Sequence, residues 1–352
     1  MRFSIIIPTR RINSYLRESL TNLKKLAYDN FEVIIVLDEE DTDFSKKNSG
    51  AKFKFLAVGS KSPGEKRNIG AKQATGEIIA FLDDDAFPSK QWLSEAKKVF
   101  ERDPDLYALG APAVTPPNAQ FLEKCSGKVL ETRLTSGSTS YRHFPGRRRA
   151  IDDYPAVNLF VKRKAFLAVG GFTKDFWPGE DTKLCLDLVR HHKRKFLYDA
   201  APVVFHHRRG LFHAHLQQIS RYAQTRGRFA IKFPKNSRVL WYFVPSLFVL
   251  GLLGGPLFIP MISNYLKDSL VALNLWTIYL SAIAFYLFLV GWVMFRVIFL
   301  DRERSFGMGI VVGLGIIATH VVYGIYFLVG LFKTPILKLR QVDPETGDYL
   351  RG

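Results

Sequence analysis

The sequence has little cysteine, since only Cys125 and Cys185 occur in 352 residues. Neither belongs to a closely spaced group of Cys and His of the kind that ligates zinc, so both are expected to be free thiols in a reducing compartment. The N-terminal apolar run Phe3–Ile7 is too short for a signal peptide. We therefore expect the soluble part of the chain to be cytoplasmic.

Acidic residues are scarce relative to basic ones, 32 against 50, which gives a formal net charge of +18. Such an excess favours a polyanion, an anionic membrane surface or an anionic substrate as partner. Many of the basic residues directly precede a long apolar region: Arg208, Arg209, Arg221, Arg226, Arg228, Lys232, Lys235 and Arg238. This position favours a cytoplasmic lipid surface, so membrane lipids are expected partners and nucleic acid is not.

Charged residues are sparse in the region 239–332, which is expected to contain the membrane spans. Its three apolar blocks each reach the roughly 20 residues that a spanning helix needs. They run over 239–262, 270–295 and 307–332. The first block contains Pro245, Pro256 and Pro260 and is either a clean span or a kinked or re-entrant segment. We expect a multi-pass membrane region of two or three helices and a polar tail over 333–352.

Basic residues around the last block favour two different topologies. Arg296, Arg302 and Arg304 favour a cytoplasmic second loop, whereas the basic residues of the tail favour a cytoplasmic C-terminus. The third block also contains His320, and an ionisable residue at membrane depth is a functional candidate.

The remainder of the chain, residues 1–235, alternates short apolar runs with segments of helical periodicity. Strands are predicted at Phe3–Ile7, Phe31–Leu37, Phe53–Val58 and Glu77–Leu82, and helices at Tyr15–Leu26 and Pro63–Ala74. This order predicts an α/β domain with a mostly parallel sheet and helices on both faces. Ligands bind such sheets at the carboxyl ends of strands, here Pro8-Thr9, Asp38 and Asp83–Asp85. The segment Thr135–Asp152 lacks periodicity and is expected to be a mobile loop.

Two acidic motifs carry candidate chemistry. Asp83 and Asp85, one residue apart at a strand end, can share one Mg²⁺ or Mn²⁺, which would neutralise a departing diphosphate. Glu180 and Asp181 follow a glycine, and a carboxylate there can deprotonate an acceptor hydroxyl. The alternative for either motif is a helix cap or a solvated turn.

Adjacent histidines, His206 and His207, follow a predicted strand at Val203–Phe205. One of them is a candidate metal ligand or a hydrogen-bond donor to the diphosphate. Because successive side chains of a strand point to opposite sides, at most one of the two is expected to reach the site. The alternative is that both lie at a basic membrane edge.

Taken in order, these motifs resemble the family 2 glycosyltransferases, which have the GT-A fold. The resemblance covers roughly residues 3–230. It is carried by Ser4–Thr9, Glu32–Asp38, Lys66–Gly70, Ala74–Asp85, Val169–Phe172 and Gly179–Asp181. It implies an inverting single displacement with a nucleotide-diphospho-sugar donor, for which UDP is the expected nucleotide.

The resemblance also implies roles for the matching positions. On the donor side it places nucleotide-sugar contacts at Pro8, Thr9, Asp38, Arg67, Asn68 and Asp83. Arg67 is alternatively a structural salt-bridge partner. Asp85 would bind the metal, with Asp83 and His206 as further ligands. Asp181 would be the catalytic base, and Glu180 would bind or orient the acceptor.

An acceptor-side motif follows at Gln218, Arg221 and Tyr222. It is similar to the Gln-x-x-Arg-Trp of processive polysaccharide synthases, whose aromatic ring stacks on the acceptor, but tyrosine replaces tryptophan. Trp177 is a further acceptor-side candidate. We expect an amphipathic interfacial segment over about 208–236, with Gln218 and Arg221 turned to the site. The alternative is a packed helix without an acceptor role.

The late motif His320-x-x-Tyr-Gly is similar to one in membrane glycosyltransferases of exopolysaccharide and succinoglycan assembly. We therefore expect sugar transfer to a lipid-linked or membrane-proximal saccharide acceptor in surface polysaccharide or glycolipid synthesis. The alternatives are a processive polysaccharide synthase, a polyprenyl-phosphate sugar synthase and a non-catalytic membrane scaffold. A polyprenyl phosphate needs no general base, so the Glu180-Asp181 motif counts against that synthase.

Overall fold

A mixed eight-stranded sheet forms the centre of the α/β body. The computed structural model describes residues 1–174, 177–267, 269–301 and 303–332, so the expected polar tail lies outside the described residues. In spatial order the strands are β3 (Phe53–Ala57), β2 (Phe31–Leu37), β1 (Phe3–Pro8), β4 (Ile78–Leu82), β9 (Asn158–Lys162), β6 (Ala108–Gly110), β10 (Phe196–Tyr198) and β8 (Arg149–Ile151). The first four are parallel, and β9 runs antiparallel between β4 and β6. The four strands predicted within residues 3–82 are therefore confirmed.

Helices cover both faces of this sheet, as expected. In chain order they are α1 (Ser14–Leu23), α2 (Thr42–Asn48), α3 (Pro63–Gln73), α4 (Trp92–Arg102), α7 (Arg163–Ala168) and α8 (Glu180–His192). Two further helices of this part of the chain, α5 (Phe121–Glu131) and α6 (Arg133–Ser136), pack against the C-terminal helices instead. Side chains alternate along β1, so Ile5 and Ile7 pack with α1 and α4 while Ile6 packs with α3, α7 and α8. The two resulting cores hold β4 rigidly and thereby the aspartates that follow it.

A second, three-stranded sheet lies at the carboxyl end of β4. Its order is β5 (Ala86–Pro88), β11 (Val204–His206) and β7 (Ala113–Val114). Strand β5 begins directly after Asp85, and its antiparallel register with β11 pairs Ala86 with His206. This pairing brings a histidine from late in the chain beside the aspartates.

The segment expected to be a mobile loop contains regular structure instead. Residues 135–152 include the end of α6, a 3₁₀ helix η1 (Gly137–Arg142) and the edge strand β8. The prediction was wrong because these elements are too short to show periodicity in the sequence. Tyr198 of β10 fixes the segment, since its hydroxyl donates to the carbonyl oxygen of Tyr141 at 2.9 Å.

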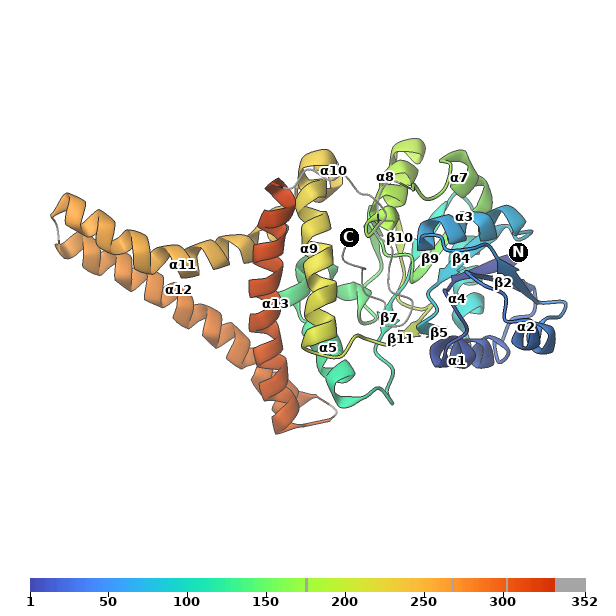
Figure 1. The fold of residues 1–352 in the computed structure, drawn as a ribbon, viewed down its shortest axis with the longest axis horizontal. Coiled ribbons are helices and arrows are strands. Elements are labelled where there is room, and N and C mark those ends of the chain that lie inside the picture. Colours follow the sequence, from blue (N-terminus) through green and yellow to red (C-terminus); the bar gives the residue numbers. More distant parts are fainter. Residues whose placement is uncertain (175–176, 268, 302, 333–352) are drawn as a thin grey trace.

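The C-terminal part is helical: α9 (His213–Lys232), α10 (Pro234–Ser237), α11 (Leu240–Leu266), α12 (Ser269–Phe295), the π-helical turn η2 (Arg296–Leu300) and α13 (Phe306–Phe332). By length and composition, 240–266, 269–300 and 306–332 are each long and apolar enough to cross a membrane. The first apolar block is one continuous helix despite its three prolines. Figure 1 shows α11 and α12 as a hairpin that projects from the body, while α13 lies beside α9.

Candidate active site

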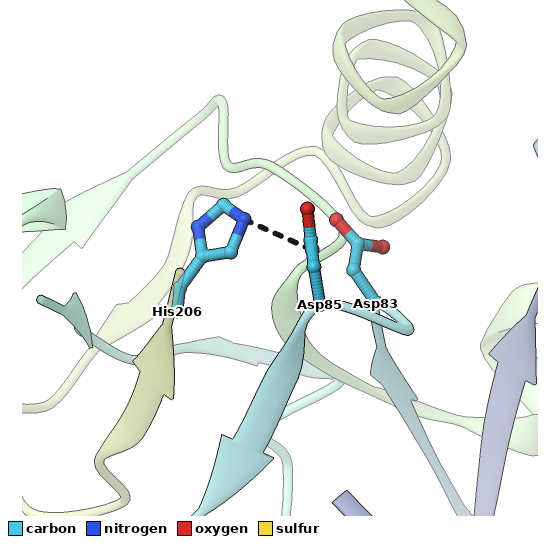
Figure 2. Close-up of side chains that lie close together, drawn as sticks. All are labelled: Asp83, Asp85 and His206. Atoms are coloured by element: carbon cyan, nitrogen blue, oxygen red, sulfur yellow. Dashed lines mark ion pairs between the residues drawn. The ribbon is translucent and has the colours of Figure 1, made fainter. Parts of the chain in front are cut away.

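Three side chains from three strand ends converge where β4 stops. One carboxylate oxygen each of Asp83 and Asp85 and one ring nitrogen of His206 all lie within 4.8 Å of one another. Figure 2 shows the three side chains directed toward a common space. Nε2 of His206 is 3.1 Å from Oδ1 of Asp85, and Arg208 lies 3.0 Å from Nδ1 on the other side of the ring. Burial opposes ionisation of Asp85, but His206 and Arg209 outweigh it and lower the pKa of this carboxyl to about 2.

This donor set suits a hard divalent cation. Two carboxylates and one imidazole nitrogen favour Mg²⁺ or Mn²⁺, whose ligands lie roughly 2.0–2.3 Å from the ion. Ligands at that distance are about 4 Å or slightly more from one another across the ion, which matches the spacing of the cluster. The residues present therefore fit the metal expected from the sequence.

The neighbouring histidine is directed elsewhere. His207 lies 2.7 Å, through Nε2, from Oε2 of Glu18 in α1. As predicted, only one of the two histidines, His206 at the end of β11, reaches the acidic cluster.

Asp84, between the two candidate ligands, holds the end of β1. Its Oδ2 accepts hydrogen bonds from the hydroxyl of Thr9 at 2.6 Å and from the amide of Asn13 at 3.3 Å. Burial, and then the charge of Asp85, raises the pKa of Asp84 to about 6. Lys66 forms an ion pair with Asp38 and also donates to the carbonyl oxygen of Thr9. The carboxyl ends of β1, β2 and β4 are thereby joined.

The second acidic pair opens α8. Gly179 precedes the helix with a φ of 117°, a conformation that glycine adopts without strain, and Glu180 and Asp181 are the first two helical residues. Asp181 is therefore not the N-cap. Burial, and then the charge of Asp181, raises the pKa of Glu180 to about 7. The pKa of Asp181 is also raised, first by burial and then by Asp153.

Arg67 links the two acidic groups. Its guanidinium lies 2.6 Å from Asp83 and 3.2 Å from Glu180, and its side chain is 6% exposed. Asn68, the next residue, exchanges two hydrogen bonds with the backbone of Phe172, at 2.7 and 2.8 Å. Arg67 thus lies between Asp83 and Glu180, whereas the amide of Asn68 fixes the turn at Phe172, which precedes α8.

A single cavity of about 500 Å³ connects these groups. Of the residues predicted from the sequence, those that line it are Pro8, Arg67, Asp83, Asp85, Trp177, Glu180, Asp181, His206, Gln218 and Tyr222. Thr9, Asp38, Asn68 and Arg221 lie outside its lining. Arg221 was expected to turn to the site with Gln218. Instead, Gln218 and Tyr222 of α9 line the cavity, and Arg221 does not.

The cavity extends to the candidate membrane helices. Trp241 and Tyr242 of α11 and His320 and Tyr323 of α13 contribute to its wall. His320 lies 3.0 Å from the carbonyl oxygen of Leu134 through Nε2 and 2.9 Å from the Tyr286 hydroxyl through Nδ1. His320 therefore ties α13 to α12 and to α6 at the border of the cavity.

Asp153, Arg142 and Arg226 are among the charged lining residues that were missed as site residues. Asp153 accepts from Arg226 of α9 at 2.5 Å and from Arg142 of η1 at 3.3 Å. In the sequence, Arg226 is one of the basic residues that were expected to face a lipid surface, and Arg142 lies in the segment that was expected to be a mobile loop. The available signal was helical spacing, because Arg226 follows Tyr222 by four residues and Gln218 by eight.

Comparison with known proteins identifies the domain. The family model for glycosyl transferase family 2 matches residues 4–167. Poly(ribitol-phosphate) beta-N-acetylglucosaminyltransferase TarS of Staphylococcus aureus is 33% identical over 180 residues, which are 44% of this chain and 31% of TarS. The pre-mycofactocin glycosyltransferase of Mycobacterium tuberculosis is 26% identical over 249 residues, 67% of this chain and 49% of that protein. The chain thus spans about a third to a half of these relatives.

A solved structure shares the fold. The mannosyltransferase PcManGT from Pyrobaculum calidifontis, determined with GDP-Man and Mn²⁺, superposes with a TM-score of 0.53 at 17% identity, over 93% of this chain and 87% of that one. Together with the mixed sheet and the family match, this shows that the chain carries a glycosyltransferase family 2 domain of the GT-A fold, followed by three helices that can span a membrane.

Proposed function

We propose that the protein transfers a sugar from a nucleotide-diphospho-sugar to a lipid-linked or membrane-proximal acceptor, with inversion at the anomeric carbon. The observation that carries this proposal is the single cavity, which joins Asp83, Asp85 and Asp181 to the walls formed by α11 and α13. In such a space a water-soluble donor and an acceptor anchored in the membrane can meet, while the donor stays in water and the acceptor stays in the membrane.

The donor side is proposed to lie at the ends of β1, β2 and β4. Asp38 would contact the base, and the backbone of Pro8 and Thr9 would contact the nucleotide, although only Pro8 of these three lines the cavity. Mg²⁺ or Mn²⁺ held by Asp85, Asp83 and His206 would neutralise charge on the departing diphosphate. The structural neighbour PcManGT was determined with GDP-Man and Mn²⁺, which supports a nucleotide sugar as the donor and a divalent ion as the cofactor. UDP remains our first choice of nucleotide, and GDP is the alternative to test.

The acceptor side is proposed to lie at the N-terminus of α8. Asp181 would take the proton of the attacking hydroxyl as the new bond to the anomeric carbon forms and the bond to the diphosphate oxygen breaks. A base on the side opposite the leaving group gives inversion. Glu180 would orient the acceptor, and Gln218, Tyr222 and Trp177 would contact its sugar. We place the catalytic domain in the cytoplasm, where nucleotide sugars are made.

A donor screen tests the proposal. Purified membranes containing the protein would receive UDP-, GDP- and dTDP-sugars, and nucleotide release would be measured with Mn²⁺, with Mg²⁺ and with excess EDTA. We expect turnover with one nucleotide class and its loss in EDTA and in Asp85→Asn. Full turnover in EDTA would contradict the metal assignment, and no release from any donor would contradict the proposed activity.

A further inference from the structure

The end of the cavity next to the membrane helices contains two arginines that face one carboxylate. Arg142 and Arg226 both contact Asp153, whose side chain is 8% exposed while each arginine side chain is 14% exposed. Burial opposes ionisation of Asp153, but the two guanidinium groups hold its pKa well below its usual range. Asp153 is therefore charged, and two positive charges face one negative charge here.

Polar atoms of this group lack partners. Nη1 of Arg226, Nε of Arg142 and the hydroxyl of Tyr323 are buried and have no hydrogen-bond partner among the described residues. Arg142, Arg226 and Tyr323 all line the cavity. A buried donor without a partner costs about 1–3 kcal/mol, and more when it is charged. All three groups are hydrogen-bond donors, and an oxygen-rich anion is a ligand that could satisfy them together.

The position of the arginine pair connects membrane and chemistry. The Arg226 guanidinium lies 5.1 Å from the ring of Tyr242, in the first turn of α11, where this candidate span leaves the catalytic domain. On the other side, Asp153 is hydrogen-bonded to the side chain of Thr182, the residue after the proposed base. An anion at Arg226 would thus lie at the depth of lipid head groups and beside the N-terminus of α8.

We propose that Arg226, Arg142 and Tyr323 bind the phosphate or diphosphate of a lipid-linked acceptor and so present its sugar to Asp181. This inference rests on the proposed function and specifies its acceptor class. Arginine suits the role because its planar fork binds phosphate oxygens in pairs. The apolar helices beside the pair favour a phosphate carried by a lipid over a free anion.

Binding to the full-length protein in phosphatidylcholine nanodiscs tests this assignment. The probes are farnesyl diphosphate, farnesol, which lacks the phosphates, and inorganic diphosphate, which lacks the lipid. We expect farnesyl diphosphate to bind at least about tenfold more tightly than either of the others. Equal binding of farnesol would overturn the phosphate site, and equal binding of inorganic diphosphate would overturn the lipid as its source.

Two substitutions locate the site. Arg226→Gln should weaken farnesyl diphosphate by about 10- to 100-fold, and Tyr323→Phe, which removes one hydroxyl and keeps the packing, by about 3- to 10-fold. The matched control is Tyr326→Phe, on the exposed side of the same helix and outside the cavity lining. Tyr323→Phe also keeps the test decisive if Arg226→Gln does not fold. Affinities equal to that of the control would overturn the assignment.

Mn²⁺-dependent binding of UDP and GDP separates this inference from the proposed function. Both variants should bind the nucleotide as the wild type does. A loss of nucleotide binding equal to the loss of farnesyl diphosphate would assign the arginines to the donor and overturn the inference. Wild-type protein that binds a nucleotide with Mn²⁺ but no farnesyl diphosphate would refute the lipid site alone, whereas protein that binds neither would refute the proposed function as well.

Discussion

Asp181 and Glu180 are adjacent carboxylates, but their contacts differ. Glu180 is held by Arg67 and by the backbone N–H of Gly179, at 3.2 and 3.1 Å. Oδ1 of Asp181 accepts from the backbone N–H of Thr182 at 2.7 Å. Both side chains line the cavity, but Glu180 is already paired with Arg67, so we propose proton transfer for Asp181 and orientation of the acceptor for Glu180.

Removal of the proposed base should slow the chemical step. Asp181→Asn keeps the shape of the side chain and removes its basicity, so we expect kcat to fall by at least about 10²-fold. Donor affinity should change little, because we propose that Asp38, the metal and the diphosphate contacts hold the donor. Single-turnover kinetics with a nucleotide-binding titration would measure both quantities. Normal turnover, or loss of donor binding, would show that Asp181 has another role, and Glu180 would be the next candidate.

Glu180 should make stability depend on pH. Its pKa in the folded protein is raised from 4.5 to about 7, so the folded state binds more protons than the unfolded state between these values. Stability is therefore lost as the pH rises through this window, by about 1–3 kcal/mol. Glu180→Gln stays neutral and lacks this loss. Tm measured from pH 5 to 8 should show a gap between variant and wild type that widens up to about pH 7; parallel curves would contradict the assignment.

At the residue scale, the sequence predicted side chains whose neighbours are local. Asp83 and Asp85 follow an apolar strand, and alternation along β11 separates His206 from His207. Arg226 could not be assigned in this way, because its role depends on Asp153, 73 residues earlier in the chain. A basic residue before an apolar block has the same local pattern whether it faces lipid or a cavity.

At the scale of elements, the long periodic segments were predictable and the short ones were not. Strands β1, β2 and β4 are largely apolar and five to seven residues long, whereas β5, β7 and β11 have two or three residues each. The small sheet that brings His206 to Asp85 is stabilised by pairing between distant segments, which leaves no periodic signal in the sequence. The cation site and the strand before its histidine were thus predicted from the sequence, while the pairing of that strand with β5 and β7 became clear only in the structure.

Close contact between α9 and α13 supports one wall of the cavity. A Cβ atom on Gly227 would lie 2.2 Å from the carbonyl oxygen of Phe327, and one on Gly330 would lie 2.2 Å from that of Gln224. Only glycine therefore allows the two backbones to approach so closely.

Gly330→Ala should force the two helices apart. We expect a loss of about 1–3 kcal/mol, seen as a Tm lower by several degrees in detergent, together with weaker donor turnover. Gly291→Ala is the matched control, since a Cβ there meets no described atom within 4 Å. Equal Tm values for the two variants would contradict this packing account.

At the scale of the whole molecule, the α/β domain and the candidate spans both contribute residues to the wall of one cavity. The projecting hairpin of α11 and α12 leaves many large apolar side chains exposed, such as Leu253, Phe258, Leu273 and Phe288. Such a surface suits a lipid environment. We expect the protein to remain in the membrane fraction through high-salt and carbonate washes, as followed by immunoblotting. Recovery in the soluble fraction would show that these helices do not span the bilayer.

The central claim is that donor and lipid-borne acceptor meet in one cavity, and the fate of a labelled sugar tests it most directly. Membranes containing the wild-type protein would be incubated with Mn²⁺ and the radiolabelled sugar of the accepted nucleotide donor, and then extracted with chloroform and methanol. The account predicts label in the lipid extract, and its loss in EDTA and in Asp181→Asn. Label found only as free sugar or as water-soluble polymer would contradict it.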